Sequence, residues 1–190
     1  MKLVFNPDDS YVHKALVVAF EKGLIDALQF DAHDPFGQET GIWEYSPLGK
    51  APVLVMENGR VLYGGLAVCE YFDAHGHGPR LFPDGHERWD AYRLMMLGDG
   101  MFDAAAMIRV EARRPRAQWN IEHIERERRK VIGVLDLLEH EVPGFDLLAF
   151  SIGQICVVGG ISYLDARNPI KNASLEVEDV GFDWRDRCPK

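Results

Sequence analysis

Two consecutive glycines, Gly64 and Gly65, separate a short apolar run from a helical pattern in the stretch VLYGGLAVCEYF, residues 61–72. A helix usually begins at Ser, Thr, Asp or Asn, whose side chain accepts a hydrogen bond from an otherwise unpaired backbone N–H. Glycine leaves those N–H groups bare. The pair therefore indicates either a binding loop that works through its backbone alone or a loop that has lost its side-chain contacts.

A second candidate for backbone chemistry is the Ala51–Pro52 bond in SPLGKAPVLV, residues 46–55. Proline can open a strand, although it cannot donate a hydrogen bond to the ladder. X–Pro bonds are the ones that adopt the cis form at an appreciable frequency. A cis bond here would turn the Ala51 backbone outward, where its N–H and C=O can pair with something extended.

The charge balance argues against a nucleic acid as partner. The formal net charge is −9, from 21 basic and 30 acidic residues, whereas binding to a phosphate backbone needs a cationic footprint. The basic clusters at 109–116 and 126–130 contain interspersed glutamates, so we interpret them as solvated helix faces.

Cysteine and histidine patterns predict no metal site. The three cysteines form no C-x-x-C motif, which also excludes a dithiol redox pair and favours a reducing, cytoplasmic location. Cys69 and Cys156 lie in apolar runs and are expected in the core. His75 and His77, near Asp73, fall at a helix end and in a linker, so we expect surface histidines.

No membrane segment is expected either. Residues 147–164 carry no charge and reach the lower length limit for a membrane helix. Ser151 and Gln154, however, have capping-box spacing. This pattern predicts a loop followed by a buried helix that begins near Ile152.

The elements that would position the glycines and the proline come from the first half of the chain. Residues 2–5 predict a strand, NPDDS supplies turn and cap residues, and a helix is expected from about Tyr11 to Gly23. Residues 27–32 predict a second strand. A strand, a helix and a strand within so short a segment imply a parallel crossover.

A hairpin and a helix follow. Asn58-Gly59 lies between two apolar runs and predicts a tight turn with positive φ at both residues. The helical pattern of residues 66–75 stops at Gly76.

The second half shows helical periodicity only. Helices are predicted over 87–113, over 121–142 and after Ser151. Gly98 and Gly100 lie inside the first of them, where each costs about 1 kcal/mol relative to Ala. We expect the close approach of another helix at both positions.

The stretch SPLGKAPVLV…NGRVLYGGLAVCEYFD resembles the glutathione-binding half of the cytosolic glutathione transferase family. That half typically shows N/S-P-x-G-K-V-P, a hairpin, then an acidic residue and a serine before a helix. NPDDSYVHK is similar to S-P-x-S-P-Y-V-R-K of a bacterial subgroup, and LGDGMFDAAAMIRVEARRP and SYLDARNP resemble that subgroup's helical domain. The resemblance spans nearly the whole chain.

The resemblance implies an α/β domain followed by an all-α domain, usually in a homodimer. We assign residues 1–77 to a thioredoxin-like, glutathione-binding domain with a cis Pro52, and 78–86 to a linker. Residues 87–190 would form the all-helical C-terminal domain, apparently without the final helix that relatives carry.

Five binding residues carry over from the resemblance. Ala51, beside Pro52, would pair with the cysteinyl backbone of glutathione, and Lys50 would lie near the glycyl carboxylate unless it is a solvated loop lysine. Gly64 and Gly65 stand where the family has its acid and serine, which hold the γ-glutamyl ammonium and carboxylate. Backbone N–H groups can still bind the carboxylate, but nothing in Gly64 replaces the acid.

The position that activates the thiol departs from the family as well. Ungapped alignment places Asp9 at the subgroup's serine, and an ionised carboxylate would raise the pKa of a neighbouring thiol. Ser10, one residue later, is the preferred catalytic candidate, with Asp9 as the alternative. Ser10 is also interpretable as a plain N-cap of the first helix.

Two functions follow from these residues. The preferred one is transfer of the glutathione thiolate to a small hydrophobic electrophile, with weakened affinity for the co-substrate and no metal. The alternative is a non-catalytic member of the fold that serves as a ligand-binding or dimeric interaction scaffold. A thiol–disulfide oxidoreductase is disfavoured because the active-site cysteine is missing.

Overall fold

The computed structural model describes residues 1–7, 9–34, 41–142 and 150–166. These residues form two compact units, one made of 1–93 with 150–155 and the other of the remainder. The expectation about the chain's final helix lies outside the described residues, as does Cys188.

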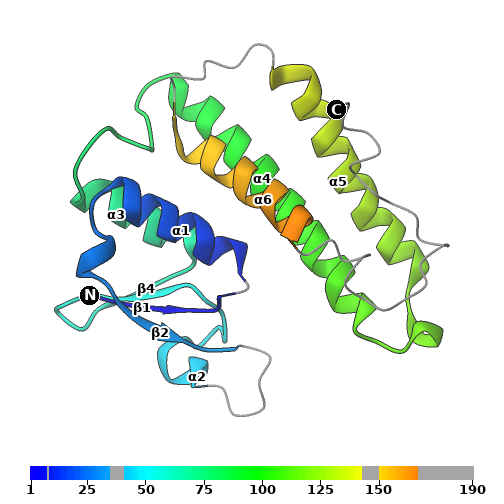
Figure 1. The fold of residues 1–190 in the computed structure, drawn as a ribbon, viewed down its shortest axis with the longest axis horizontal. Coiled ribbons are helices and arrows are strands. Elements are labelled where there is room, and N and C mark those ends of the chain that lie inside the picture. Colours follow the sequence, from blue (N-terminus) through cyan, green and yellow to red (C-terminus); the bar gives the residue numbers. More distant parts are fainter. Residues whose placement is uncertain (8, 35–40, 143–149, 167–190) are drawn as a thin grey trace. The chain divides into compact units, whose positions relative to one another are not determined.

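The first unit contains a four-stranded mixed sheet of thioredoxin-like topology (Figure 1). Its strands are β1 (Lys2–Phe5), β2 (Gln29–Ala32), β3 (Val53–Val55) and β4 (Val61–Tyr63), in the order β2-β1-β3-β4. β1 and β2 run parallel, as the short crossover predicted, and the other two pairs are antiparallel.

Helices α1 (Ser10–Glu21) and α3 (Gly65–His75) lie together on one face of this sheet (Figure 1). A single turn of helix, α2 (Ile42–Tyr45), precedes β3. α1 and α3 run side by side in the same direction, because Tyr11 packs against Gly65 at their starts and Lys22 packs against Gly76 at their ends. Both positive helix ends therefore lie at the same edge of the unit.

The hairpin between β3 and β4 is confirmed, but its turn differs from the expectation. Gly59 has a φ of +77°, whereas no residue other than glycine has a positive φ among the described residues. The Met56 N–H donates to the Arg60 carbonyl at 2.8 Å, which closes a three-residue loop. Asn58 instead accepts the Arg60 N–H on its side chain at 3.0 Å. The glycine alone supplies the left-handed position of this longer turn.

The helical part of the chain comprises α4 (Glu87–Ala112), α5 (Ile121–Glu141) and α6 (Ile152–Ala166). Leu94, Leu138 and Val157 of these three helices form a common buried cluster. The predicted capping box is present, since the Ser151 N–H donates to Gln154 Oε1 at 3.0 Å. None of the helices in the described part of the chain combines the length and hydropathy that crossing a bilayer requires.

The two glycines of α4 have different surroundings. A β-carbon on Gly98 would overlap the backbone of Cys156 and Val157, so α6 crosses α4 here at a separation that only glycine permits. Gly160 of α6 lies at the same crossing, because a β-carbon on it would come within 2.9 Å of the Gly98 carbonyl oxygen. Gly100 has no neighbour within 4 Å of such an atom. The expected close approach is thus right for Gly98 and wrong for Gly100.

Alanine substitution should separate these two glycines. Gly98→Ala is expected to lower the free energy of unfolding by about 3 kcal/mol, because backbone cannot move aside as a flexible side chain does. Gly100→Ala is expected to raise it by about 1 kcal/mol through helix propensity. Urea denaturation of both variants measures the difference, and equal effects would contradict the crossing geometry.

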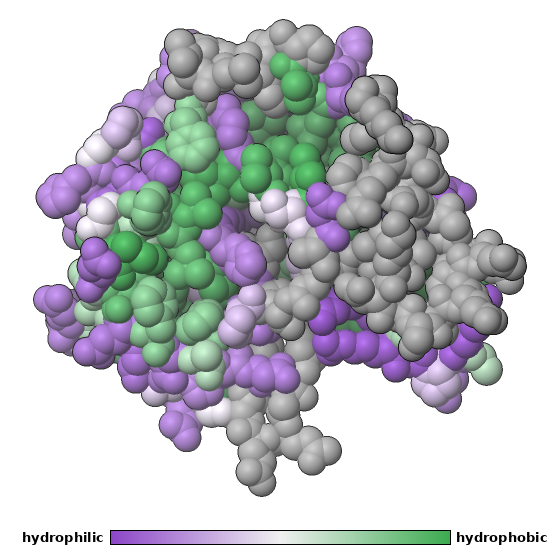
Figure 2. All heavy atoms as spheres, in the orientation of Figure 1, coloured by the Kyte–Doolittle hydropathy of each residue, from purple (hydrophilic) through white to green (hydrophobic). Residues whose placement is uncertain are grey.

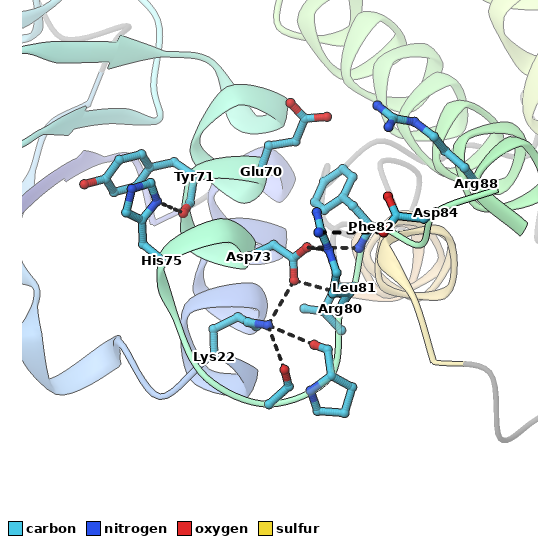
Figure 3. A network of polar contacts seen from close by, with 12 residues as sticks. Lys22, Glu70, Tyr71, Asp73, His75, Arg80, Leu81, Phe82, Asp84 and Arg88 are labelled. Atoms are coloured by element: carbon cyan, nitrogen blue, oxygen red, sulfur yellow. Dashed lines mark hydrogen bonds and ion pairs between the residues drawn. The ribbon is translucent and has the colours of Figure 1, made fainter.

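A buried polar network joins the ends of α1 and α3 to the segment that follows them (Figure 3). The Asp73 carboxylate lies 3.1 Å from the Lys22 ammonium, and both side chains are 2% exposed. Asp73 also accepts the backbone N–H groups of Leu81 and Phe82, at 2.8 and 3.2 Å. Lys22 donates to the Pro79 carbonyl at 2.9 Å. The Lys22 ammonium and both carboxylate oxygens of Asp73 therefore all have polar partners.

Removing the charge of Asp73 should destabilise the fold strongly. Asp73→Asn keeps the shape but leaves the Lys22 ammonium buried without its counter-ion, which typically costs about 3–5 kcal/mol. Asp84→Asn is the matched control, because Asp84 lies 3.7 Å from Arg80 at the surface, and a change within about 0.5 kcal/mol is expected. Urea denaturation compares them; an Asp73→Asn effect as small as the control's would disprove the role of the network.

Candidate functional site

The first helix begins at Ser10, and its N-cap is Asp9. The Tyr11 N–H donates to Asp9 Oδ1 at 2.8 Å, while the Asp9 carbonyl accepts the N–H groups of Val12 and His13. The interpretation of Ser10 as the N-cap is therefore wrong. A carboxylate serves better here, because it accepts hydrogen bonds at the positive end of the helix.

Asp9 is nevertheless held in a partly buried position that disfavours its charge. Burial raises the pKa of the Asp9 carboxyl to about 6, from an ordinary value of 3.8. The N–H groups of Tyr11 and Val12 act in the opposite direction, as do the nearby His13 and Lys14. His13 in turn lies with its ring nitrogen 2.8 Å from the Pro7 carbonyl oxygen. Desolvation is thus the dominant effect on this carboxyl.

The second helix start, at Gly64, has no side-chain cap. Gly64 is exposed and has a φ of +85° and a ψ of 151°, a region that only glycine adopts readily. Its N–H donates to the Pro52 carbonyl at 3.0 Å, which ties the start of α3 to the proline. At the start of α3, therefore, no side chain of the N-cap residue covers the first backbone N–H groups.

Gly65 is buried, and its missing side chain is replaced by parts of α1. A β-carbon at this position would lie 2.9 Å from Lys14 Cε and 3.2 Å from a ring carbon of Tyr11. Lys14 is only 3% exposed, and its Nζ lies 4.5 Å from the centre of the Tyr11 ring. A serine at position 65 would press on both residues, so this glycine is part of the packing.

Neither Tyr11 nor Lys14 was singled out from the sequence. The available signal was a lysine three residues after Tyr11 and four before the buried Val18, which places it on the same side of α1 as both. A lysine in such a position is rarely buried. Gly65, which leaves room for this one, is 51 residues away in the sequence, so the sequence pattern did not reveal it.

Ala51 and Pro52 lie between the two helix starts. The bond that joins them is cis. Ala51 is buried in one cluster with Val4, Val12 and Val53. Among the described residues none forms a backbone hydrogen bond with Ala51. Lys50, the residue before it, is exposed.

The candidate site is thus an edge of the first unit where three backbone segments meet. Val12 joins the start of α1 to Ala51, the Pro52 carbonyl joins the proline to Gly64, and Tyr11 joins α1 to Gly65. Such an edge offers peptide groups and the uncapped positive end of α3 to an extended anionic ligand. Within the described ranges, no group of three or more His, Cys, Asp or Glu residues is placed to hold a metal ion.

Comparisons with known proteins point in one direction. Residues 10–75 match the family described as glutathione S-transferase, N-terminal domain. The crystal structure of a glutathione transferase family member from Pseudomonas fluorescens Pf-5, with bound glutathione, is 32% identical; the match covers 88% of this chain and 84% of that one, with a TM-score of 0.82. A glutathione S-transferase from Methylobacillus flagellatus KT with glutathione bound is 27% identical over 97% and 87% of the two chains, with a TM-score of 0.83. The uncharacterized GST-like protein YibF of Escherichia coli K12 is 29% identical over 88% of this chain and 83% of its own.

The environment of Asp9 makes stability depend on pH. Because the pKa of Asp9 is higher in the folded state, protonation of its carboxyl stabilises the folded protein. This contribution to the free energy of unfolding is fully present below pH 3.8 and is lost as the pH rises through about 6. Asp9→Asn is neutral at every pH and keeps a good N-cap. We expect the variant to gain stability over the wild type between pH 4 and 7, by at most about 3 kcal/mol.

Urea denaturation at the two pH values measures this gain. A free-energy difference between variant and wild type that stays constant with pH would show that the carboxyl titrates normally.

Proposed function

Because this chain belongs to the glutathione transferase family, we propose that it binds glutathione as co-substrate and transfers its thiolate to a small hydrophobic electrophile. The observation that carries the proposal is the meeting of the α1 start, Ala51–Pro52 and the α3 start at one edge of the first unit. The alternative is a non-catalytic scaffold of the same fold, which the two glycines and Asp9 favour, because they replace the family's acid and its two serines.

Glutathione would be bound mainly through its backbone and carboxylates. Ala51 would pair with the cysteinyl segment, beside Pro52, and the N–H groups that follow Gly64 and Gly65 would receive the γ-glutamyl carboxylate at the positive end of α3. Lys50, which is exposed, would attract the glycyl carboxylate.

Affinity would be weakened at the γ-glutamyl end. Gly64 offers no carboxylate to the ligand's ammonium, and its backbone conformation is strained for any residue with a side chain. Loss of one charge-assisted hydrogen bond costs about 1.5–3 kcal/mol, which is roughly tenfold to a hundredfold in affinity.

The thiol would lie at the start of α1, beside Ser10 or Asp9. A Ser10 hydroxyl would stabilise a thiolate by donating a hydrogen bond, which is the usual way to lower a thiol's pKa. Asp9 caps the helix and is fixed by the Tyr11 N–H.

We also propose a cytoplasmic homodimer. Hydrophobic side chains reach the surface over the region of α1 and α3 (Figure 2), and Phe20 of α1 is 68% exposed, with Val17 and Leu66 also exposed. Apolar surface of this kind is commonly covered by a subunit contact. Cys69 and Cys156 are buried and form no disulfide within the described part of the chain, as suits a reducing compartment.

Calorimetric titration with glutathione tests the binding proposal. The wild type should bind, and Lys50→Met should weaken binding by up to about fivefold, the usual size of an exposed ion pair. Arg60→Met, which removes one positive charge from the exposed hairpin turn, is the matched control and should leave affinity unchanged. A folded protein that releases no heat with glutathione would favour the scaffold.

An analogue tests the weakened end separately. Glutaryl-cysteinyl-glycine lacks the γ-glutamyl ammonium, so it should bind about as well as glutathione, within roughly twofold, if no acid faces that group. A loss of tenfold or more, which corresponds to about 1.4 kcal/mol, would mean that another acidic group replaces the missing one.

A further inference from the structure

The turn that joins α2 to Ala51 is built on a buried serine. Ser46 is only 1% exposed, and its carbonyl accepts the Gly49 N–H at 3.0 Å. The segments on either side of the turn are fixed in the core, because Ile42 of α2 and Ala51 belong to the same buried cluster. The part of the chain that remains to be held is therefore residues 47–50.

The side chain of Trp43 lies against this part of the turn. Gly49 has a φ of +59°, and a β-carbon on it would lie 2.6 Å from Trp43 Cζ2 and 2.9 Å from Cζ3. The benzene edge of the indole thus packs directly on the backbone of Gly49. Trp43 is nevertheless 63% exposed, although tryptophan is highly buried on average. Its contact with Gly49 therefore covers a single point of the backbone.

Lys50 is the residue that this contact affects. It follows Gly49 directly and is exposed. Within the described ranges, no hydrogen bond or ion pair holds the Lys50 ammonium. The direction of its side chain is therefore set by the backbone on which it stands. Ala51, the next residue, is fixed separately by its place in the core.

Resting on the glutathione binding proposed above, we infer that Trp43 is a positioning residue for the glycyl end of glutathione. Through its contact with Gly49, the indole holds the turn so that the Lys50 ammonium meets the glycyl carboxylate. Without the ring, Gly49 regains the conformational freedom of glycine. The lysine must then be ordered when the ligand binds, and this ordering lowers the affinity.

Calorimetric titration with glutathione tests the inference. Trp43→Ala should weaken binding by about threefold, and by no more than Lys50→Met, because it acts through that lysine. In a variant that already carries Lys50→Met, adding Trp43→Ala should change Kd by less than about 1.5-fold. Trp89→Ala is the matched control, because Trp89 is 69% exposed, and it should leave Kd unchanged.

A truncated ligand shows which end of glutathione is affected. γ-Glutamylcysteine lacks the glycyl residue, so the wild type and Trp43→Ala should bind it equally well, within about 1.5-fold. A loss of general stability would weaken both ligands alike.

Gly49→Ala disturbs the same contact from the other side. Its methyl group would meet the indole of Trp43, so this variant should weaken glutathione binding as Trp43→Ala does. Gly59→Ala is its control, because Gly59 also has a positive φ, of +77°, but no neighbour within 4 Å of such an atom. It incurs similar backbone strain and should bind glutathione like the wild type. Circular dichroism of each variant verifies that it is folded.

The outcomes separate this inference from the proposed function. A Trp43→Ala variant that binds glutathione like the wild type would overturn the inference alone. The same holds if its effect adds to that of Lys50→Met, because the ring would then contact the ligand by itself, or if the loss persists with γ-glutamylcysteine. A folded wild type that does not bind glutathione would overturn the proposed function and the inference together.

Discussion

The ion pair between Lys22 and Asp73 holds the first unit in the arrangement on which its candidate site depends. Both side chains of the pair are buried, and they lie where α1 and α3 end. Backbone groups of the following segment complete it, through Leu81, Phe82 and Pro79. A buried pair of this kind adds little net stability over an apolar replacement, but an unpaired member is costly. The pair therefore ties the ends of the two helices to each other and to the segment that follows them.

This arrangement brings both helix starts to one edge. Tyr11 and Lys14 then meet Gly65, and the Pro52 carbonyl meets the Gly64 N–H. This edge therefore presents peptide groups and helix starts rather than a row of side-chain charges. Among the side chains described at this edge, Asp9 is held by the Tyr11 N–H and Lys14 by packing against Gly65. The edge thus keeps a defined shape without an acid or a serine at positions 64 and 65.

Glycines in this chain serve three different physical purposes. Gly64 adopts a backbone conformation that side chains resist, Gly65 leaves room for a lysine, and Gly98 lets α6 cross α4 closely. Gly100 does none of these, although it lies only two residues after Gly98 in the same helix. The value of a glycine therefore depends on what its missing side chain would have met, which differs between residues of the same helix.

The sequence alone determined the elements of this fold, because their signals are local. The bounds of α1, the capping box of α6 and the presence of a hairpin at Asn58-Gly59 follow from periodicity and from cap and turn residues within a few positions. Motif resemblance added the family and the mixed sheet. Only the tertiary structure decided that the pKa of Asp9 is raised and that Lys14 fills the space at Gly65. These features depend on burial and on contacts between segments far apart in the chain, and no short sequence pattern encodes either.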